Sequence, residues 1–261
     1  MLELILIAVV CILTWLVLRG GWQQKLAVLD LRPKGEALLL GIASVALAVY
    51  FIGPYGGVAL IISVMVHEFG HVAAFRVAGH PDARFRLIPM FGGVAISNKA
   101  PKSQLHQFYI SIMGPGICLA LMLVSFVMDH ALEGIWPNAS YFFWRLATIT
   151  AALNFFNMLP LWPLDGGKIV HILTHAISPT LAHFTILAMS AALVGLALLW
   201  QSVFLFIFAA ISAQSAFSAS HGGRMGHSLK PGQAITAFFA YITMLAAFGM
   251  GGIDMIIRMF F

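Results

Sequence analysis

Charged side chains are scarce in this sequence of 261 residues, because lysine, arginine, aspartate and glutamate together make up only 9% of it. A soluble domain usually carries about a quarter of its residues as charged side chains. Hydrophobic residues reach 61%, and the mean hydropathy is +0.96. This composition excludes an ordinary soluble domain and predicts an integral membrane protein whose length suits one compact bundle.

Acidic residues are the scarcer of the charged types, with 9 against 14 basic residues. The basic residues are spread over short loops, and no stripe of basic and aromatic residues indicates nucleic acid as a partner. There is no internal repeat, and no hydrophilic stretch is long enough to form an appended soluble domain. The N-terminus lacks the basic segment and cleavage site of a signal peptide, so we expect a retained first span.

Cysteine is nearly absent, since Cys11 and Cys118 are the only two in the chain. Both lie in apolar runs of sequence. Their placement favours buried free thiols over a disulfide or a metal site.

Apolar segments long enough to cross a membrane, about twenty residues each, recur along the whole chain. The two segments on either side of Trp200 could form a tight hairpin, which leaves the exact count open. We therefore predict an all-α polytopic membrane protein with about six to eight transmembrane helices. The candidate spans are Leu2–Leu18, Ala37–Ile52, Gly57–Val77, Leu105–Met128, Phe142–Leu159, Ala182–Leu199, Val203–Phe217 and Ala234–Gly251.

The basic residues predict the orientation of these spans. If the spans alternate in direction, Arg145 and Arg258 lie on one side and all the other lysines and arginines lie on the opposite side. Short loops rich in lysine and arginine stay in the cytoplasm. We therefore expect the basic loops on the cytoplasmic side and the N-terminus outside.

A β-hairpin is predicted between the third and fourth spans. The stretch "RFRLIPMFGGVAIS", Arg84–Ser97, alternates polar and apolar residues, meets the pair Gly92 and Gly93, and then resumes. This pattern is typical of a small hairpin, and Pro89 favours an edge position. The alternative is an irregular cytoplasmic loop.

Three costly polar residues are concentrated in "VMVHEFGHVAAF", a stretch that is otherwise apolar. On a helix, His67 and His71 are one turn apart and share a face. Two imidazoles at this spacing can bind one tetrahedral zinc ion. Glu68 then projects beside the first ligand, where it can act as general base toward a water molecule. The alternative, a chance cluster, would be rare.

A third ligand is needed to complete such a site, and "NFFNMLPLWPLDGGKIV" offers Asp165. Pro160 and Pro163 should break a regular helix here, while Gly166 and Gly167 should let the backbone turn so that the carboxylate faces inward. The alternative for Asp165 is an ordinary helix-ending residue. The topology favours the ligand role, because it places the aspartate and both histidines at the cytoplasmic ends of their spans.

With "HEFGH" followed by "NMLPLWPLDGG", the sequence resembles the site-2 protease family of intramembrane zinc metalloproteases. The resemblance covers roughly Gly57 to Val170, and the segments Phe91–Gly93 and Gly114–Gly116 are similar to two weaker family features. Cys118 departs from the pattern, because relatives often have asparagine shortly after the Gly-Pro pair. The second family motif, N-x-x-P-x-x-x-x-D-G, is matched at Asn157, Pro160, Asp165 and Gly166.

The resemblance implies an intramembrane zinc metalloendopeptidase with one Zn²⁺ per chain and Glu68 as its catalytic base. It implies regulated cleavage of a single-span membrane protein within the bilayer, near the cytoplasmic face, in a bacterial or archaeal cytoplasmic membrane. The core would occupy residues 57–170, between N-terminal helices in 1–56 and C-terminal helices in 171–261. The form would be minimal, without PDZ or CBS domains.

Substrate-binding residues are also implied. Asn157 would hold the substrate or polarise its carbonyl, and Asn154 is a second candidate whose alternative is helix–helix hydrogen bonding. The hairpin around Gly92 and Gly93 would pair with an extended substrate strand.

Other functions and sites stay open at this point. A zinc-binding escort that does not cleave is one alternative, although it would not need Glu68, and a metal-ion transporter is another. His171 and His175 repeat the four-residue spacing and could form a second metal site, but a wet helix face is favoured. His221 and His227 are expected in a loop, and His106 at a span entrance without a role.

Overall fold

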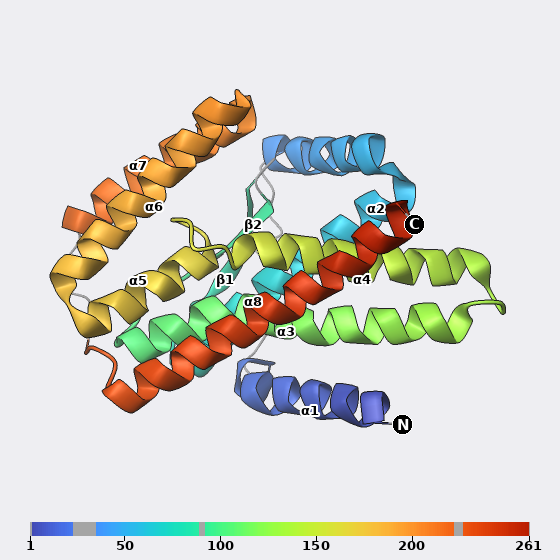
Figure 1. Ribbon diagram of the computed structural model, residues 1–261, viewed down its shortest axis with the longest axis horizontal. Helices are drawn as coiled ribbons and strands as arrows, with labels where there is room; N and C mark the ends of the chain where they lie inside the picture. The colour runs from blue at the N-terminus through green and yellow to red at the C-terminus, as the bar shows by residue number, and fades with distance from the viewer. Residues whose placement is uncertain (1, 23–34, 89–91, 222–226, 261) are drawn as a thin grey trace. The chain divides into compact units, whose positions relative to one another are not determined.

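A computed structural model describes residues 2–22, 35–88, 92–221 and 227–260 of the chain. The described part contains eight helices and one two-stranded sheet (Figure 1). This architecture confirms the predicted all-α fold with a small hairpin. In chain order the elements are α1 (Leu2–Trp22), α2 (Gly35–Val77), β1 (Arg84–Ile88), β2 (Gly92–Ile96), α3 (Gln104–Leu132), α4 (Pro137–Asn157), α5 (Asp165–Ile177), α6 (Pro179–Trp200), α7 (Val203–His221) and α8 (Pro231–Phe260).

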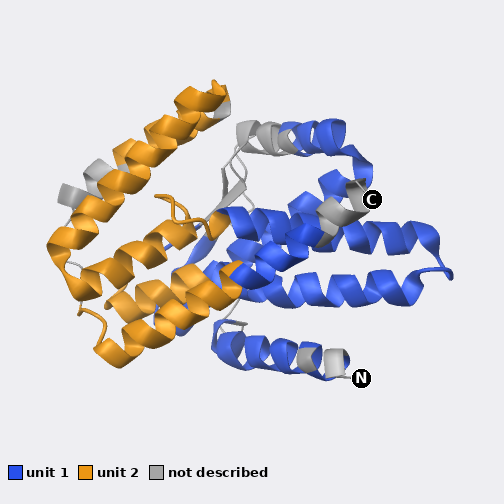
Figure 2. Cartoon of the chain, in the orientation of Figure 1, with its two compact units in different colours: residues 1–100, 113–156, 246–261 blue, residues 101–112, 157–245 orange. Residues whose placement is uncertain are grey.

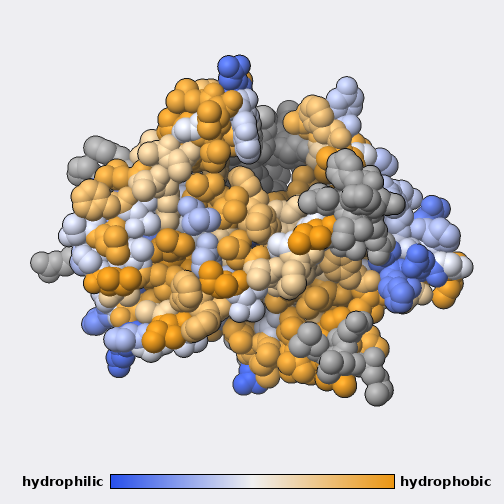
Figure 3. All heavy atoms as spheres, in the orientation of Figure 1, coloured by the Kyte–Doolittle hydropathy of each residue, from blue (hydrophilic) through white to orange (hydrophobic). Residues whose placement is uncertain are grey.

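Four stretches in the described residues are long and apolar enough to cross a membrane: Val45–Val77, Gln104–Leu132, Pro179–Trp200 and Pro231–Ile253. Many large hydrophobic side chains on the helices are exposed, and hydrophobic residues cover much of the face drawn in Figure 3. Water would disfavour so much exposed apolar surface, whereas lipid accommodates it. The chain is an integral membrane protein.

The chain divides into two compact units (Figure 2). The first comprises residues 1–100, 113–156 and 246–261, and the second comprises residues 101–112 and 157–245. Each unit is therefore built from segments that are distant in the sequence.

Helix α2, in the first unit, contains a sharp break that Figure 1 shows as a bend. Gly53 has φ 77° and ψ 168°, a conformation that side-chain-bearing residues rarely adopt, and Pro54 follows it without a backbone N–H. The break interrupts the helical hydrogen-bond ladder, and the Arg145 guanidinium donates to the carbonyl of Ile52 at 3.0 Å. The break falls between the two spans predicted for this region.

The predicted hairpin follows α2 in the same unit. Strands β1 and β2 are antiparallel, with pairs running from Arg84↔Ile96 to Ile88↔Gly92. Gly92 and Gly93 thus lie inside the second strand rather than at the turn, and the connecting residues, Pro89 and Phe91 included, lie outside the described residues. The sheet packs on the end of α2 through Val72, Phe75, Ala83 and Ala95.

Hydrogen bonds to Asp82 connect the two chain ends at the open end of this hairpin. The backbone N–H of Asn98 donates to the Asp82 carboxylate at 2.6 Å, and the Ser97 hydroxyl donates to it at 3.2 Å. The Asn98 bond is the main reason that the pKa of Asp82 lies below its usual value, with smaller contributions from Ser97 and His80. These hydrogen bonds connect the end of β2 to the loop that follows α2.

In the second unit, α6 and α7 form a tight hairpin, which the sequence had left as one possibility for the two segments beside Trp200. Gln201, between the two helices, adopts the left-handed conformation with φ 48°. The Ser190 and Ser212 hydroxyls lie 3.2 Å apart, and Ser212 donates to the Trp162 carbonyl at 2.6 Å. These bonds hold the hairpin against the segment that precedes α5.

The Gln104 side chain connects two other parts of the second unit. Its side-chain oxygen accepts from the Leu229 N–H at 3.2 Å, and its Nε2 contacts His175 Nδ1 at 2.7 Å. His227 lies outside the helices and strands, as predicted for a loop residue. It pairs with Ser103 in an isolated β-bridge. His221, in contrast, is the last residue of α7 and not a loop residue.

Candidate metal centre

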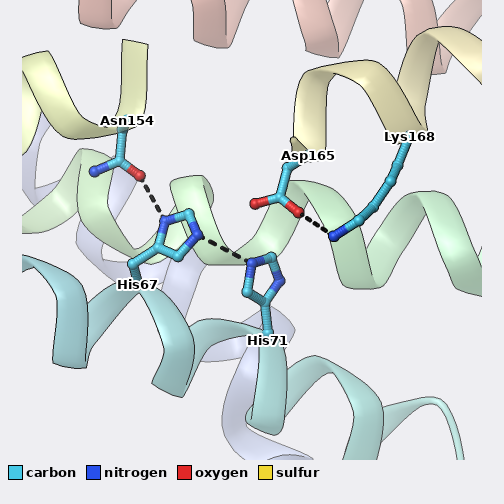
Figure 4. A network of polar contacts seen from close by, with 5 residues as sticks. All are labelled: His67, His71, Asn154, Asp165 and Lys168. Atoms are coloured by element: carbon cyan, nitrogen blue, oxygen red, sulfur yellow. Dashed lines mark hydrogen bonds and ion pairs between the residues drawn. The ribbon is translucent and has the colours of Figure 1, made fainter. Parts of the chain in front are cut away.

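The two histidines of the H-E-x-x-H motif lie one turn apart on α2 and are both buried, with exposed fractions of 5% and 7%. The Nε2 atoms of His67 and His71 lie 3.1 Å apart (Figure 4). Zinc–nitrogen bonds of about 2.0–2.1 Å in a tetrahedral site put two such nitrogens roughly 3.3 Å apart. The pair is therefore spaced as two ligands of one zinc ion would be.

Asn154 of α4 contacts His67 at Nδ1, the ring nitrogen that does not face His71. Its Oδ1 faces His67 Nδ1 (Figure 4), and the two atoms lie 2.8 Å apart. The exposed fraction of Asn154 is 0%. From the sequence, Asn154 was a candidate for a substrate contact or for a helix–helix hydrogen bond. In the structure this side chain joins α4 to α2 through the histidine.

Gly114 of α3 provides the space that the second histidine occupies. A Cβ atom built on this glycine would lie 2.4 Å from His71 Nε2 and 2.5 Å from His71 Cε1. Real Cβ atoms essentially never come so close to another heavy atom, so a side chain here would displace the ring. Gly114 is the first residue of the segment that resembles a weak family feature, and its packing on His71 is a physical reason for glycine there.

Glu68 follows His67 in the same turn of α2 and is partly exposed. Glu68 is therefore an acidic residue that lies between the two histidines in the sequence and on the same helix. Its proximity to the imidazoles follows from its position in the motif and suits a base that acts on water beside a metal ion.

Asp165 is the first residue of α5, in the second unit, and its exposed fraction is only 4%. The positive end of the helix dipole favours a carboxylate at this position. The Lys168 ammonium, one turn further on, lies 3.0 Å from Asp165 Oδ1 (Figure 4). The lysine is a counter-ion that the motif did not reveal, although its i,i+3 spacing could have indicated it.

The glycines after Asp165 serve close packing and not the turn expected from the sequence. Neither is among the glycines with positive φ. A Cβ on Gly166 would lie 2.1 Å from the Met158 carbonyl oxygen, and one on Gly167 would lie 2.3 Å from that of Leu161. The chain between α4 and α5 therefore runs directly against the first turn of α5, and it is not helical, as Pro160 and Pro163 predicted.

By their donor atoms, His67, His71 and Asp165 form a possible metal-binding group, the set predicted from the sequence. Two imidazoles and one carboxylate are a ligand set that zinc accepts, with a fourth position left for water. The donor chemistry and the spacing of the histidine nitrogens both fit zinc.

The remaining predicted residues lie at the ends of elements. Asn157 is the last residue of α4 and is half-buried, while Gly92 and Gly93 form the start of β2. These positions leave their predicted roles in substrate binding as hypotheses.

The second pair of histidines lies on α5 and has protein partners. His171 Nδ1 lies 3.3 Å from the Ala182 carbonyl oxygen, and His175 Nδ1 contacts Gln104. Burial lowers the pKa of His171, which favours its neutral form. The described residues contain no second group of three metal-binding side chains.

Comparisons with known proteins find similarity to zinc metalloproteases. The family description "Peptidase family M50" matches residues 133–202, which include Asn157 and Asp165. The protein Rip3 of Mycobacterium tuberculosis is 34% identical over 127 residues, which are 48% of this chain and 32% of that protein. The zinc metalloprotease MJ0392 of Methanocaldococcus jannaschii is 31% identical over 111 residues, 42% of this chain and 32% of that one.

Stage IV sporulation protein FB of Bacillus subtilis is 32% identical over 121 residues, 44% of this chain and 38% of that protein. The matched part thus spans about a third of the length of these relatives. Among solved structures, a site-2 protease from Methanocaldococcus jannaschii aligns with a TM-score of 0.46 and 21% identity over 74% of this chain and 92% of that one.

The fold and the candidate centre define a polytopic helical membrane protein with a possible metal-binding group, two of whose members lie on the apolar helix α2. The two motifs, the match to peptidase family M50 over residues 133–202 and the zinc metalloproteases among the relatives support a member of the site-2 protease family.

Proposed function

We propose that this chain is an intramembrane zinc metalloendopeptidase that cleaves a transmembrane segment of a single-span membrane protein near the cytoplasmic face. The observation that carries the proposal is the pair of buried imidazole nitrogens 3.1 Å apart on the helix that also presents Glu68. His67, His71 and Asp165 would hold the ion, one per chain. The names of the relatives add support, since MJ0392 is named a zinc metalloprotease.

The metal and the glutamate would divide the chemistry between them. When bound, zinc supplies Lewis acidity that lowers the pKa of water toward neutrality. Glu68 accepts the proton that this water loses as it attacks the peptide carbonyl. Glu68 then returns the proton to the amine that leaves, so one side chain serves as base and as acid.

Two further parts of the chain would handle the substrate. A peptide bond inside a membrane helix is shielded by the helix's own hydrogen bonds, so the helix must unwind before attack. The hairpin formed by β1 and β2 would offer an edge to which an extended peptide can pair. Asn157, at the end of α4, would donate to the carbonyl oxygen as negative charge develops on it.

The orientation proposed from the basic loops places the ligands toward the cytoplasm. His67 and His71 lie in the last three turns of α2, whose C-terminal end leads into the arginine-bearing hairpin. This placement supports a cut near the cytoplasmic face, such as one that releases a membrane-held regulator or clears a signal-peptide remnant.

Two other functions fit these features less well. An escort that only holds membrane proteins would not need an acidic residue beside the two histidines. A metal-ion transporter would need successive sites along a path, and the described residues contain no second group of three side chains that could hold a metal ion. The peptidase accounts for both the ligands and Glu68.

The test is cleavage of a reporter transmembrane substrate by the purified protein in lipid vesicles, with and without a zinc chelator. We expect cleavage that the chelator stops and added zinc restores. Glu68→Gln should lower turnover by roughly 10²–10⁴-fold or more, the usual value of a catalytic base, while the protein keeps its zinc. Near-normal turnover by zinc-loaded Glu68→Gln protein would refute the base role.

The same variant can identify the substrate. Because Glu68→Gln should bind substrate without turning it over, membrane proteins that co-purify with it and not with a His67→Ala/His71→Ala variant are candidates. The sequence of the captured proteins would then distinguish single-span substrates from other partners.

A further inference from the structure

The hydrogen bonds of Asn154 fix which way round its amide lies. Its Nδ2 donates to the backbone carbonyl of Thr150 at 2.8 Å, one turn earlier on α4. A carbonyl oxygen can only accept, so the group that faces it must be the NH₂. The amide oxygen therefore faces His67, from which it is separated by 2.8 Å.

This orientation determines the tautomer of His67. The amide oxygen can only accept a hydrogen bond, so His67 Nδ1 must carry the proton and donate it. In the neutral ring, Nε2 then carries the lone pair. Nε2 is the atom that faces His71 Nε2 at 3.1 Å, which is where a metal ion would accept it as a ligand.

We infer that Asn154 is a positioning residue that holds His67 in the tautomer and ring orientation required of a metal ligand. The inference rests on the proposed zinc site and assigns the asparagine to the metal instead of the substrate. Both polar ends of its side chain are engaged, and its exposed fraction is 0%. Partners of this kind typically contribute 10–100-fold to metal affinity.

A second polar contact joins the same helices one turn away and supplies a control. Thr150 Oγ1 and Ser63 Oγ lie 2.6 Å apart, and Ser63 donates to the Ala59 carbonyl at 2.8 Å. Ser63 precedes His67 by one turn on α2, just as Thr150 precedes Asn154 on α4. Thr150→Val removes this helix–helix bond but keeps the backbone carbonyl that orients Asn154.

The experiment measures zinc affinity by competition with a chelator in detergent, independently of cleavage. Asn154→Leu, which has a similar volume but no acceptor, should bind zinc roughly 10–100-fold more weakly. Asn154→Asp keeps an oxygen acceptor for His67 but loses the donor to the Thr150 carbonyl, so it should bind zinc more tightly than Asn154→Leu does. Thr150→Val should bind zinc as the wild type does, although its thermal stability falls.

The absorption spectrum of the cobalt-loaded protein adds a readout that a merely structural role would not move. The ligand-field bands of Asn154→Leu should shift, whereas those of Asn154→Asp and Thr150→Val should match the wild type. Wild-type zinc affinity and bands in folded Asn154→Leu would overturn the inference, as would an equal loss of affinity in Thr150→Val.

A measurement on the unmodified protein covers the case in which Asn154→Leu does not fold. Nitrogen NMR of the metal-free wild type, with His67 assigned by comparison with His67→Gln, should show a proton on Nδ1 and none on Nε2. A proton on Nε2 alone would overturn the inference. This result does not depend on activity, so an inactive wild-type protein would refute the proposed function and leave the tautomer assignment standing.

Discussion

His67 and His71 are residues whose roles can be measured directly by metal analysis. Their Nε2 atoms already lie at roughly the separation of two zinc ligands. We expect one zinc ion per chain in the purified wild type and close to none in the His67→Ala/His71→Ala variant. Asp165→Asn should also lose zinc, because an amide is a much poorer ligand than a carboxylate. A stoichiometry near one that persists in the double variant would eliminate this ligand set.

Gly114 gives a second prediction at the scale of single residues. Gly114→Ala would place a methyl group 2.4 Å from His71 Nε2, so the ring must move away from its position beside His67. We expect zinc affinity to fall by about tenfold or more, as when the support of a ligand is lost.

The matched control for this change is Gly195→Ala on α6. A Cβ atom there would meet nothing within 4 Å, and alanine favours a helix over glycine by roughly 0.5–1 kcal/mol. The control should keep the zinc affinity and gain slightly in thermal stability. If Gly114→Ala behaves like Gly195→Ala, the space at Gly114 is not what positions His71.

At the scale of elements, the hairpin of β1 and β2 carries the proposal for substrate unwinding. Successive backbone N–H groups of a strand point to opposite edges, so prolines at neighbouring residues test different edges of β2. Proline at Val94 or Ile96 should remove a donor from the substrate edge and lower cleavage, while zinc content and thermal stability are kept. Proline at Ala95 should instead weaken the pairing with β1 and lower the melting temperature.

The competing explanation is that this segment only anchors the protein at the membrane surface through its arginines. Arg84→Ala/Arg86→Ala should then reduce cleavage strongly, whereas pairing with substrate predicts little effect. Wild-type cleavage by the proline variants at Val94, Ala95 and Ile96 would show that substrate unwinding belongs elsewhere, and the stretch 154–163 would be the next candidate.

At the scale of the whole molecule, the distribution of lysine and arginine predicts the orientation in the membrane. The two native cysteines are free thiols, so both can be replaced without breaking a disulfide. A single cysteine introduced at Glu133, in the turn between α3 and α4, should react with an impermeant thiol reagent added outside the cell. One introduced at Lys102, before α3, should react only after the membrane is opened.

Both chosen positions are exposed, so access by the reagent is limited by the membrane and not by burial. The opposite labelling pattern would place the basic loops outside and reverse the proposed orientation. It would also move the expected cut to the external face.

Local sequence determined much of this protein. The scarcity of charge and the repeated apolar segments predicted the helices. The gap between the predicted spans Ala37–Ile52 and Gly57–Val77 contains the break in α2, and a hairpin of α6 and α7 was one possibility for the segments beside Trp200. The four-residue spacing of His67 and His71 predicted their common face, because helical periodicity is a local property. The motif also predicted Asp165 as a ligand, but no predicted span covers α5, the helix that this residue begins.

Only the tertiary structure decided what packs against these residues. Asn154 reaches His67 across 87 positions of sequence, and Gly114 makes room for His71 from another helix. Helices that are apolar all round carry no pattern that says which face meets which neighbour. The same limit explains why Gly166 and Gly167 were assigned to a turn: the carbonyls of Met158 and Leu161 that leave no space for a side chain become neighbours only when the chain packs.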